Sequence, residues 1–490
     1  MLRRLFAIPD RHPQGRLLAA FAGLCVLTIS ASIVLEAWWL MALPAAMLTV
    51  WVAALDFRPV FFLMLAAIPL SMEAELPGGL GTDLVSEPLM WLLTLASGLW
   101  LLRHGANIDG RFVRHPISLL LLLHLAWTVV CSAGSQDWVV SLKFLLAKVW
   151  YVAVFYFLAS RMLQTERDFK SFVWCFFVPL FFIVPVVLWR HAALGFSFKD
   201  VERVMGPFFR NHVMYACMLA VFLPFVWYAT YWYRRGAAVW WWLVAGILLF
   251  LTGINFAYTR AAYVALVAAV GIYWLMRRRL MKVTLAAALL VGALFVGFVR
   301  SGDNWLEFAP DFERTVTHAR FDNLLEATTK LQDISTMERV HRWVAASYMI
   351  RDRPLLGFGP GTFYFFYQHY TVTSFKTYVS RNPERSGIHN YYLMITVEQG
   401  ILGLLFFLSL CLYAIVRGER VYAATEEPGR RRMLVASLLC FILIDLLMLM
   451  NDFVETDKIG SFFFMCLAIL VNTDLANQDR LQAPAPAVQP

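Results

Sequence analysis

Three ionisable residues beside long apolar runs have side chains that suit phosphate binding and proton transfer. Arg210 lies in "GPFFRNHVMYA", Arg260 in "YTRAAYVAL" and His389 in "GIHNYYL". A guanidinium is always charged and binds phosphate through two parallel hydrogen bonds. A neutral imidazole near pH 7 is the most frequent general base. Because a charge in or beside a membrane-spanning segment is costly, each of the three is a candidate functional residue.

Structural explanations compete with these functions. Arg210 also suits an interfacial position in which its guanidinium reaches lipid phosphates. Arg260 has almost no loop around it in which to be solvated, whereas a single histidine such as His389 is more often structural than catalytic. Arg339 and Arg342 are weaker candidates, one helical turn apart on a predicted helix, and a solvated helix face explains them equally well.

The composition indicates that lipid is the solvent for most of the chain. Of 490 residues, 60% are apolar and 15% are charged, whereas a soluble domain has roughly half and a quarter. Apolar runs of about 20 residues, long enough to cross a bilayer, recur along the chain and predict an all-α integral membrane protein of about 12 to 14 spans. The net charge of +9 comes from short basic clusters between these runs, which are orientation signals and not a nucleic-acid surface. The seven cysteines form no Cys-x-x-Cys pair, so neither a disulfide framework nor a zinc site is expected.

The predicted spans alternate with short loops. They are 17–35, 37–55, 58–70, 86–102, 116–133, 143–160, 170–190, 212–232, 238–256, 260–276, 281–299, 390–416, 433–450 and 459–473. The first is preceded by arginines and is as long as a full span, so we expect it to be retained and not cleaved.

Lysine and arginine occupy every second loop, which predicts a cytoplasmic N-terminus in a bacterial inner membrane. The remaining loops are poor in these residues, and 71–87 is acidic. The long polar stretch 301–388 is therefore predicted to face the periplasm. The expected organisation is a first membrane part (1–300), this periplasmic domain (301–388), a second membrane part (389–473) and a cytoplasmic tail (474–490).

Inside the polar stretch, Ser335 and Glu338 have the spacing of a capping box and predict a helix over about 337–351. Pro354 ends this helix, and "LLGFGPGTF" at 355–363 predicts a glycine-rich turn that other backbone can approach closely. We interpret the aromatic run at 363–370 as a membrane-interface belt.

An ordered set of motifs over residues 200–415 resembles the O-antigen ligase and polymerase superfamily of bacterial envelope enzymes. His389-Asn390, nine further residues and then Gly400-x-x-Gly403 is similar to the ligase signature, although Leu404 departs from its usual next residue. The segments "RDRPLLGFGPGTF", "YTRAAYVAL" and "GPFFRNHVMYA" are similar to further family segments in the same order.

This resemblance implies transfer of a glycan from a polyprenyl diphosphate carrier to an acceptor hydroxyl. It assigns Arg210 and Arg260 to the diphosphate and His389 to the hydroxyl proton, with Arg339, Arg342 and Asn390 as further candidates. A single displacement would invert the anomeric carbon. No Asp-x-Asp cluster lies near these motifs, so arginines would replace a metal, and no cofactor is expected. The acceptor would be lipid A-core for a ligase.

Other interpretations remain open at this point. A polymerase would use a growing glycan as acceptor, and related members glycosylate proteins or build exopolysaccharide. A transporter or flippase would show repeated halves or broken helices, and the sequence indicates neither. An envelope-assembly scaffold would need none of the candidate residues.

Overall fold

The computed structural model describes residues 13–36, 38–76, 80–105, 110–301, 334–372, 380 and 387–482. Each predicted span overlaps helical residues of the structure. Nine of the described helices are long and apolar enough to cross a membrane, and three shorter ones are also apolar. The prediction of an all-α multi-pass membrane protein is therefore confirmed. Most of the stretch 301–388 and the last residues of the tail lie outside the described residues.

The helices differ in length, and two strands form one hairpin. The helices are α2 (Pro13–Val34), α3 (Ala42–Leu55), α4 (Phe57–Ala67), α5 (Ser86–His104), α6 (Arg111–Arg114), α7 (Pro116–Ala133), α8 (Trp138–Val152), α9 (Ala159–Met162), α10 (Glu166–Ala193), α11 (His212–Ala229), α12 (Ala238–Phe256), α13 (Arg260–Arg277), α14 (Met281–Arg300), α16 (Ile334–Asp352), α17 (Phe363–Phe366), α18 (Tyr391–Ala424), α19 (Pro428–Leu447) and α20 (Asp457–Gln482), and the antiparallel strands are β1 (Met72–Leu76) and β2 (Leu80–Leu84).

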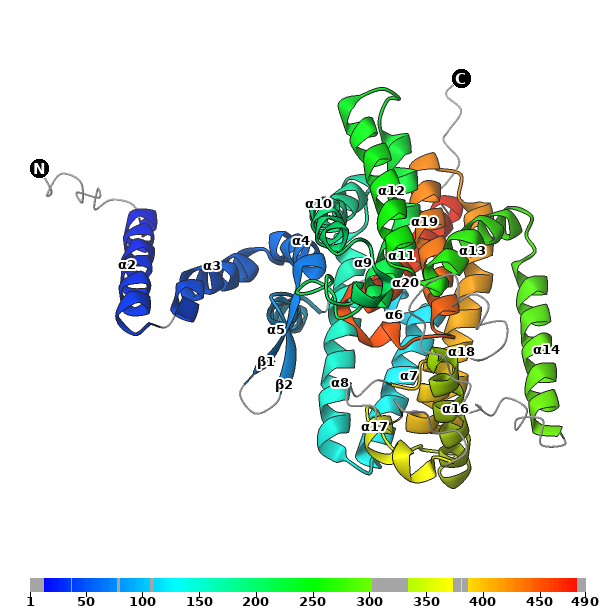
Figure 1. Ribbon diagram of the computed structural model, residues 1–490. Helices are drawn as coiled ribbons and strands as arrows, with labels where there is room; N and C mark the ends of the chain where they lie inside the picture. Colours follow the sequence, from blue (N-terminus) through cyan, green and yellow to red (C-terminus); the bar gives the residue numbers. More distant parts are fainter. Residues whose placement is uncertain are drawn as a thin grey trace, which may run out of the picture.

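The centre of the bundle is built from α11, α19 and α20. Of the residues in the most apolar stretch of each helix, 83% are buried in α20 and 72% in α11, whereas only 6% are buried in α14. Figure 1 shows α14 at one edge and α2 and α3 extending away from the bundle at the other. Apolar helices with so little protein contact are stable only if lipid covers them.

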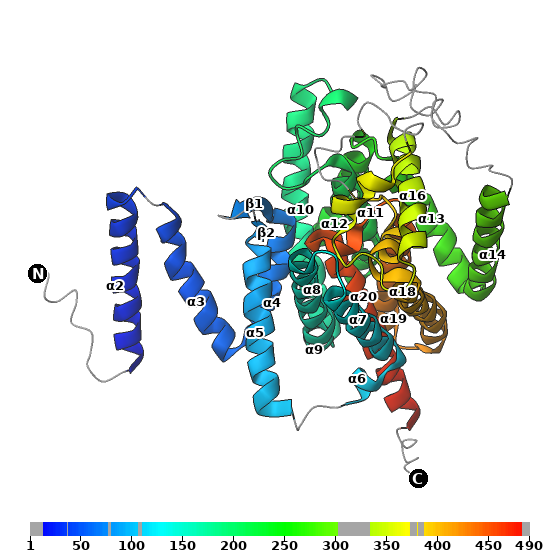
Figure 2. The same ribbon diagram turned by 90° about the horizontal axis from the view of Figure 1, so that it is seen from below.

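One end of the bundle collects the starts of α11, α13, α18 and α20 and the end of α19. The backbone N–H of Tyr391 donates to the carbonyl of Met448 (2.8 Å), and the Thr259 hydroxyl lies 3.4 Å from the His212 carbonyl. We call this the His389 end. Figure 2 shows α16 and the hairpin β1–β2 towards this end, and α6 and the C-terminus at the other. The basic loops between α13 and α14 and between α18 and α19 belong to the opposite end.

The hairpin β1–β2 is fixed to the start of α20 by buried polar groups. The hydroxyls of Ser71 and Ser86 both donate to Asp457 Oδ2, at 3.1 and 2.7 Å. The Lys458 ammonium donates to the Ser71 carbonyl and hydroxyl, at 3.0 and 2.7 Å. Since each buried charge has partners, the network is satisfied and ties α4 and α5 to the central helix.

Helix α18 is broken at Gly400, a feature that the sequence analysis did not anticipate. Gly400 has φ 72° and ψ −178°, so the helix changes direction there. The carbonyls freed by the break accept backbone N–H groups from the predicted glycine-rich turn: Phe358 donates to Val397 and Gly359 to Glu398, both at 3.0 Å. The expectation of unbroken helices was therefore wrong. Because protein backbone fills the break, it does not have the open, ion-lined form of a transporter site.

The predicted helix in the polar stretch is confirmed as α16. The turn after it is also confirmed, with Gly357, Gly359 and Gly361 at φ 69°, 113° and 77°. A Cβ atom on Gly400 would lie 1.9 Å from the carbonyl oxygen of Leu355. Glycine is therefore required at position 400 as well as in the turn.

Candidate active site

His389 occupies a strained position directly before α18. Its φ is 57°, in the left-handed region that few non-glycine residues adopt and that histidine and asparagine tolerate better than most. The next residue, Asn390, caps α18, because its Oδ1 accepts the Leu393 N–H at 3.0 Å. Backbone strain of this kind is often found at functional sites. It fixes the direction in which the imidazole leaves the backbone.

Helix α16 lies across the residues that lead into His389. The Arg342 guanidinium is 4% exposed and donates to the Gly387 carbonyl at 2.7 Å. The Trp343 indole donates to the Ile388 carbonyl at 3.2 Å. Arg342 also lies 3.5 Å from Glu338 on its own helix. Two of the predicted candidates, Arg342 and Arg339, thus belong to the surroundings of His389.

These surroundings favour the neutral imidazole. Burial, followed by the charges of Arg342 and Arg339, lowers the pKa of His389 from 6.5 to about 3, against the opposite influence of the Asn451 side chain. Because the folded-state pKa lies below the unfolded value, the resulting stability is fully present above pH 6.5 and is lost as the pH falls towards 3. Without substrate, the imidazole of His389 is neutral at pH 7 and can accept a proton, although a base with so low a pKa is weak.

Asp452, between α19 and α20, is a neighbour that was not among the predicted site residues. A Cβ atom on Gly387 would lie 2.2 Å from its Oδ2, so the carboxyl group rests against the chain leading to His389. Burial, and then the nearby carboxylate of Glu455, raises the pKa of Asp452 to about 7, while Arg342 acts in the opposite direction. The signal in the sequence was an acidic residue just after an apolar run, which alone does not separate a site residue from a solvated helix end.

Lys148 and Tyr391 form a second buried polar group beside this region. The Lys148 ammonium, 2% exposed, donates to the Tyr391 hydroxyl at 2.9 Å and to Glu455 Oε1 at 2.6 Å. The hydrogen bond to Tyr391 joins α8 to the start of α18, two residues after His389, and the ion pair with Glu455 joins α8 to the α19–α20 connection. Glu455 therefore pairs with Lys148.

Arg210 and Arg260 stand at the starts of two neighbouring helices. Arg210 is exposed and precedes Asn211, whose Oδ1 caps α11 by accepting the Met214 N–H at 2.8 Å. Arg260 is half-buried and is the first residue of α13. The hydrogen bond between Thr259 and His212 described above joins these two starts.

The site therefore consists of two pairs of arginines at the His389 end. Arg339 and Arg342 lie beside the imidazole, while Arg210 and Arg260 lie on the helices α11 and α13, both of which pack against α19. The α19–α20 connection carries Asn451 and Asp452 beside His389 and Gly387. The structure brings the candidate residues to one end of the bundle, with the side-chain oxygen of Asn390 used as a cap.

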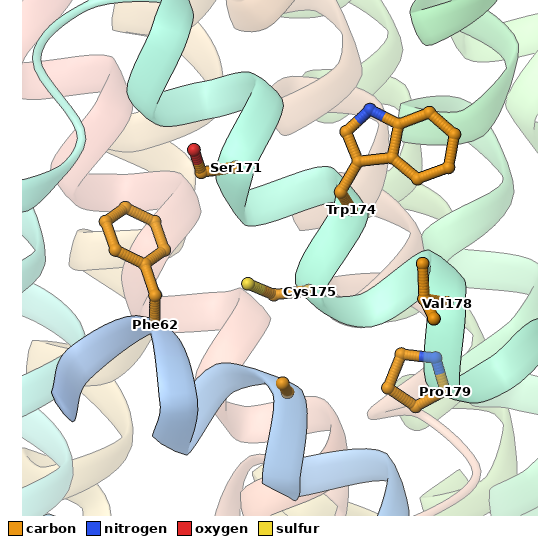
Figure 3. Close-up of a pocket in the computed structure, with 7 residues that line it drawn as sticks. Phe62, Ser171, Trp174, Cys175, Val178 and Pro179 are labelled. Atoms are coloured by element: carbon orange, nitrogen blue, oxygen red, sulfur yellow. The ribbon is translucent and has the colours of Figure 1, made fainter. Parts of the chain in front are cut away.

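One described cavity is lined by none of these residues and has a different character. It has a volume of about 510 Å³ between α4 and α10 and is lined mainly by apolar side chains. Figure 3 shows Phe62 facing Cys175, Val178 and Pro179 across it. These α10 residues lie in the half of the helix that starts at the opposite end of the bundle. Such a cavity suits a hydrocarbon chain, not a diphosphate.

Comparison with known families supports the interpretation from the motifs. Residues 244–408 match the family model described as O-antigen ligase. This match confirms the resemblance to the O-antigen ligase and polymerase superfamily that the motifs indicated. The match covers α13, α14, α16 and the break in α18, and supports glycan transfer of the ligase and polymerase type. No curated protein matches the chain significantly.

Proposed function

We propose that this protein transfers a glycan from a polyprenyl diphosphate carrier to a hydroxyl of lipid A-core, at the periplasmic face of a bacterial inner membrane. The observation that carries the proposal is the grouping of His389 with Arg339 and Arg342 at the bundle end opposite the basic loops. By the positive-inside rule, the basic loops belong to the cytoplasm. The reaction would then take place where a carrier-linked glycan and its acceptor meet outside the cytoplasm.

In this proposal the acceptor oxygen attacks the anomeric carbon as His389 takes its proton. The bond from that carbon to the phosphate oxygen breaks, and its electron pair leaves with the polyprenyl diphosphate. Arg210 and Arg260 bind the diphosphate and stabilise the charge that develops on it. The new bond forms on the face opposite the leaving group, so the configuration is inverted. No metal or cofactor takes part.

The bound donor would also strengthen the base. The negative charge of a diphosphate held by Arg210 and Arg260 acts on His389 in the direction opposite to the charges of Arg342 and Arg339. Burial, the largest cause of the lowered pKa, remains, so the pKa of His389 rises only part of the way, which still makes the imidazole a stronger base. The imidazole becomes an effective base only when the leaving group is in place.

A strain that lacks this protein provides the test of the reaction. We expect full-length glycan chains to accumulate on the carrier and to be absent from lipid A-core, with both effects reversed by the wild-type gene. The measurement is gel analysis of envelope glycans together with quantification of carrier-linked glycan. Accumulation of single repeat units on the carrier would contradict the ligase activity and identify a polymerase, whose acceptor is the growing glycan.

A further inference from the structure

Glu398 is a buried acidic residue inside a membrane-spanning helix that neither the reaction nor the family signature explains. It is 2% exposed and lies between His389 and the break at Gly400. A carboxylate at such a position is costly unless it has specific partners. Its two oxygens have them: Oε2 accepts the Gly361 N–H at 2.9 Å, and Oε1 accepts the Phe363 N–H at 3.0 Å.

These hydrogen bonds hold the segment 354–363 inside the break of α18. The same segment is bound to the break through backbone as well, since Ile401 N–H donates to the Pro354 carbonyl at 2.8 Å. On its other side, the Ser141 hydroxyl of α8 donates to the Pro360 carbonyl at 2.8 Å. A Cβ atom on Gly357 would lie 2.4 Å from the carbonyl carbon of Glu398. The segment therefore fits tightly between α8 and α18.

The segment 354–363 follows α16 directly, so its position determines where the C-terminal end of α16 lies. The middle of α16 is attached through Arg342 and Trp343 to the carbonyls of Gly387 and Ile388, as described above. Between the two attachments, the first turns of α18 run from His389 to the break. Helix α16 is thereby joined to α18 at both ends of this short helical stretch.

We propose that Glu398 is a positioning residue that clamps the segment 354–363 into the break of α18 and so holds Arg339 and Arg342 beside His389. The effect of Glu398 on transfer rests on the proposed function. Its effect on the segment 354–363 rests on the geometry alone. A displacement of about 1 Å in catalytic geometry can reduce a rate by roughly 100-fold. The clamp thus has a kinetic consequence although Glu398 touches no substrate.

The test replaces Glu398 by glutamine in the full-length purified protein. Glutamine keeps the size, but its amide nitrogen replaces one acceptor oxygen and faces a backbone N–H. We expect hydrogen exchange of the peptide spanning 357–366 to become at least about tenfold faster, and kcat to fall by roughly tenfold to 100-fold. The pKa that the acid limb of the kcat/KM profile reports should rise towards 6.5, because the arginines of α16 move away from His389, while Asn451 and Asp452 belong to the α19–α20 connection and stay in place.

The matched control is Glu419→Gln on the same helix. Glu419 is 5% exposed and accepts the Met281 N–H at 2.9 Å near the opposite end of the bundle. This variant should keep the wild-type kcat, pH profile and exchange of 357–366. If Glu398→Gln does not accumulate, Ser141→Ala removes the milder contact to Pro360 and should change all three measurements in the same direction by smaller factors.

If hydrogen exchange of the peptide 357–366 is unchanged in Glu398→Gln, Glu398 does not hold the segment 354–363 and the proposal is wrong. Faster exchange with an unchanged kcat and pH profile would overturn the positioning role. Absence of transfer by the wild-type protein would contradict the proposed function instead, and the exchange measurement would still decide whether Glu398 holds the loop.

Discussion

Replacing His389 by asparagine is expected to reduce glycan transfer by about 10² to 10⁴-fold while leaving the amount of membrane-inserted protein unchanged. Asparagine accepts the left-handed backbone conformation at this position, which alanine does not. The variant therefore removes the base without adding strain at the start of α18. The measurement is the transfer rate of the purified protein at pH 7 with saturating donor.

His369→Asn is the control for this variant. His369 is exposed and lies on the same connection between α16 and α18, so its loss should leave the transfer rate unchanged. A transfer rate in His389→Asn equal to that of the wild-type protein would remove His389 from the reaction. It would also require another explanation for the strained backbone at this position.

Replacing Arg260 by alanine is expected to raise the KM for the carrier-linked donor by roughly tenfold to 100-fold, and to lower kcat as well. Charge-assisted hydrogen bonds from a guanidinium to a phosphate contribute about 1.5 to 3 kcal/mol, and the interaction strengthens as the leaving group gains charge. Arg260→Lys keeps the charge but not the two parallel hydrogen bonds, so its effect should be intermediate. Initial rates at varied donor concentration give both parameters.

Arg277→Ala is the matched control, because Arg277 is exposed at the other end of the same helix. It should have wild-type kinetics. Equal effects of Arg260→Ala and Arg277→Ala would indicate general destabilisation of α13 and contradict a role of Arg260 in donor binding. Arg210→Ala should behave as Arg260→Ala does, since the two residues begin neighbouring helices.

The membrane helices could be predicted because lipid imposes a simple requirement. A span needs about 20 apolar residues and internal hydrogen bonding of its backbone, and both depend on local sequence. The predicted spans 116–133 and 238–256 agree with α7 and α12 at both ends. Local signals also predicted α16 from the capping-box spacing and the following turn from its glycines.

Features that depend on contacts between distant segments could not be predicted in this way. The break in α18 was missed because Gly400 within an apolar run is also compatible with a straight helix. It becomes a break only because the segment 354–363 supplies backbone partners from outside the helix. For the same reason the sequence did not distinguish Glu398 from an ordinary interfacial glutamate.

The candidate site shows the same division between local and distant information. Residue type and position relative to the spans made His389 and the four arginines candidates. The sequence did not indicate that Arg342 is buried against Gly387, or that Asp452 lies against the same glycine. Asn390 was selected as part of a signature, and the structure shows that its side-chain oxygen caps α18.

The central claim is that this protein joins a carrier-linked glycan to an acceptor, and reconstituted transfer tests it most directly. The purified protein is placed in liposomes with a polyprenyl diphosphate-linked glycan and lipid A-core, in the presence of a metal chelator. We predict that glycan appears on lipid A-core with release of one polyprenyl diphosphate for each chain transferred. Movement of the intact carrier-linked glycan across the bilayer without bond cleavage, or no transfer by the folded protein, would contradict the account.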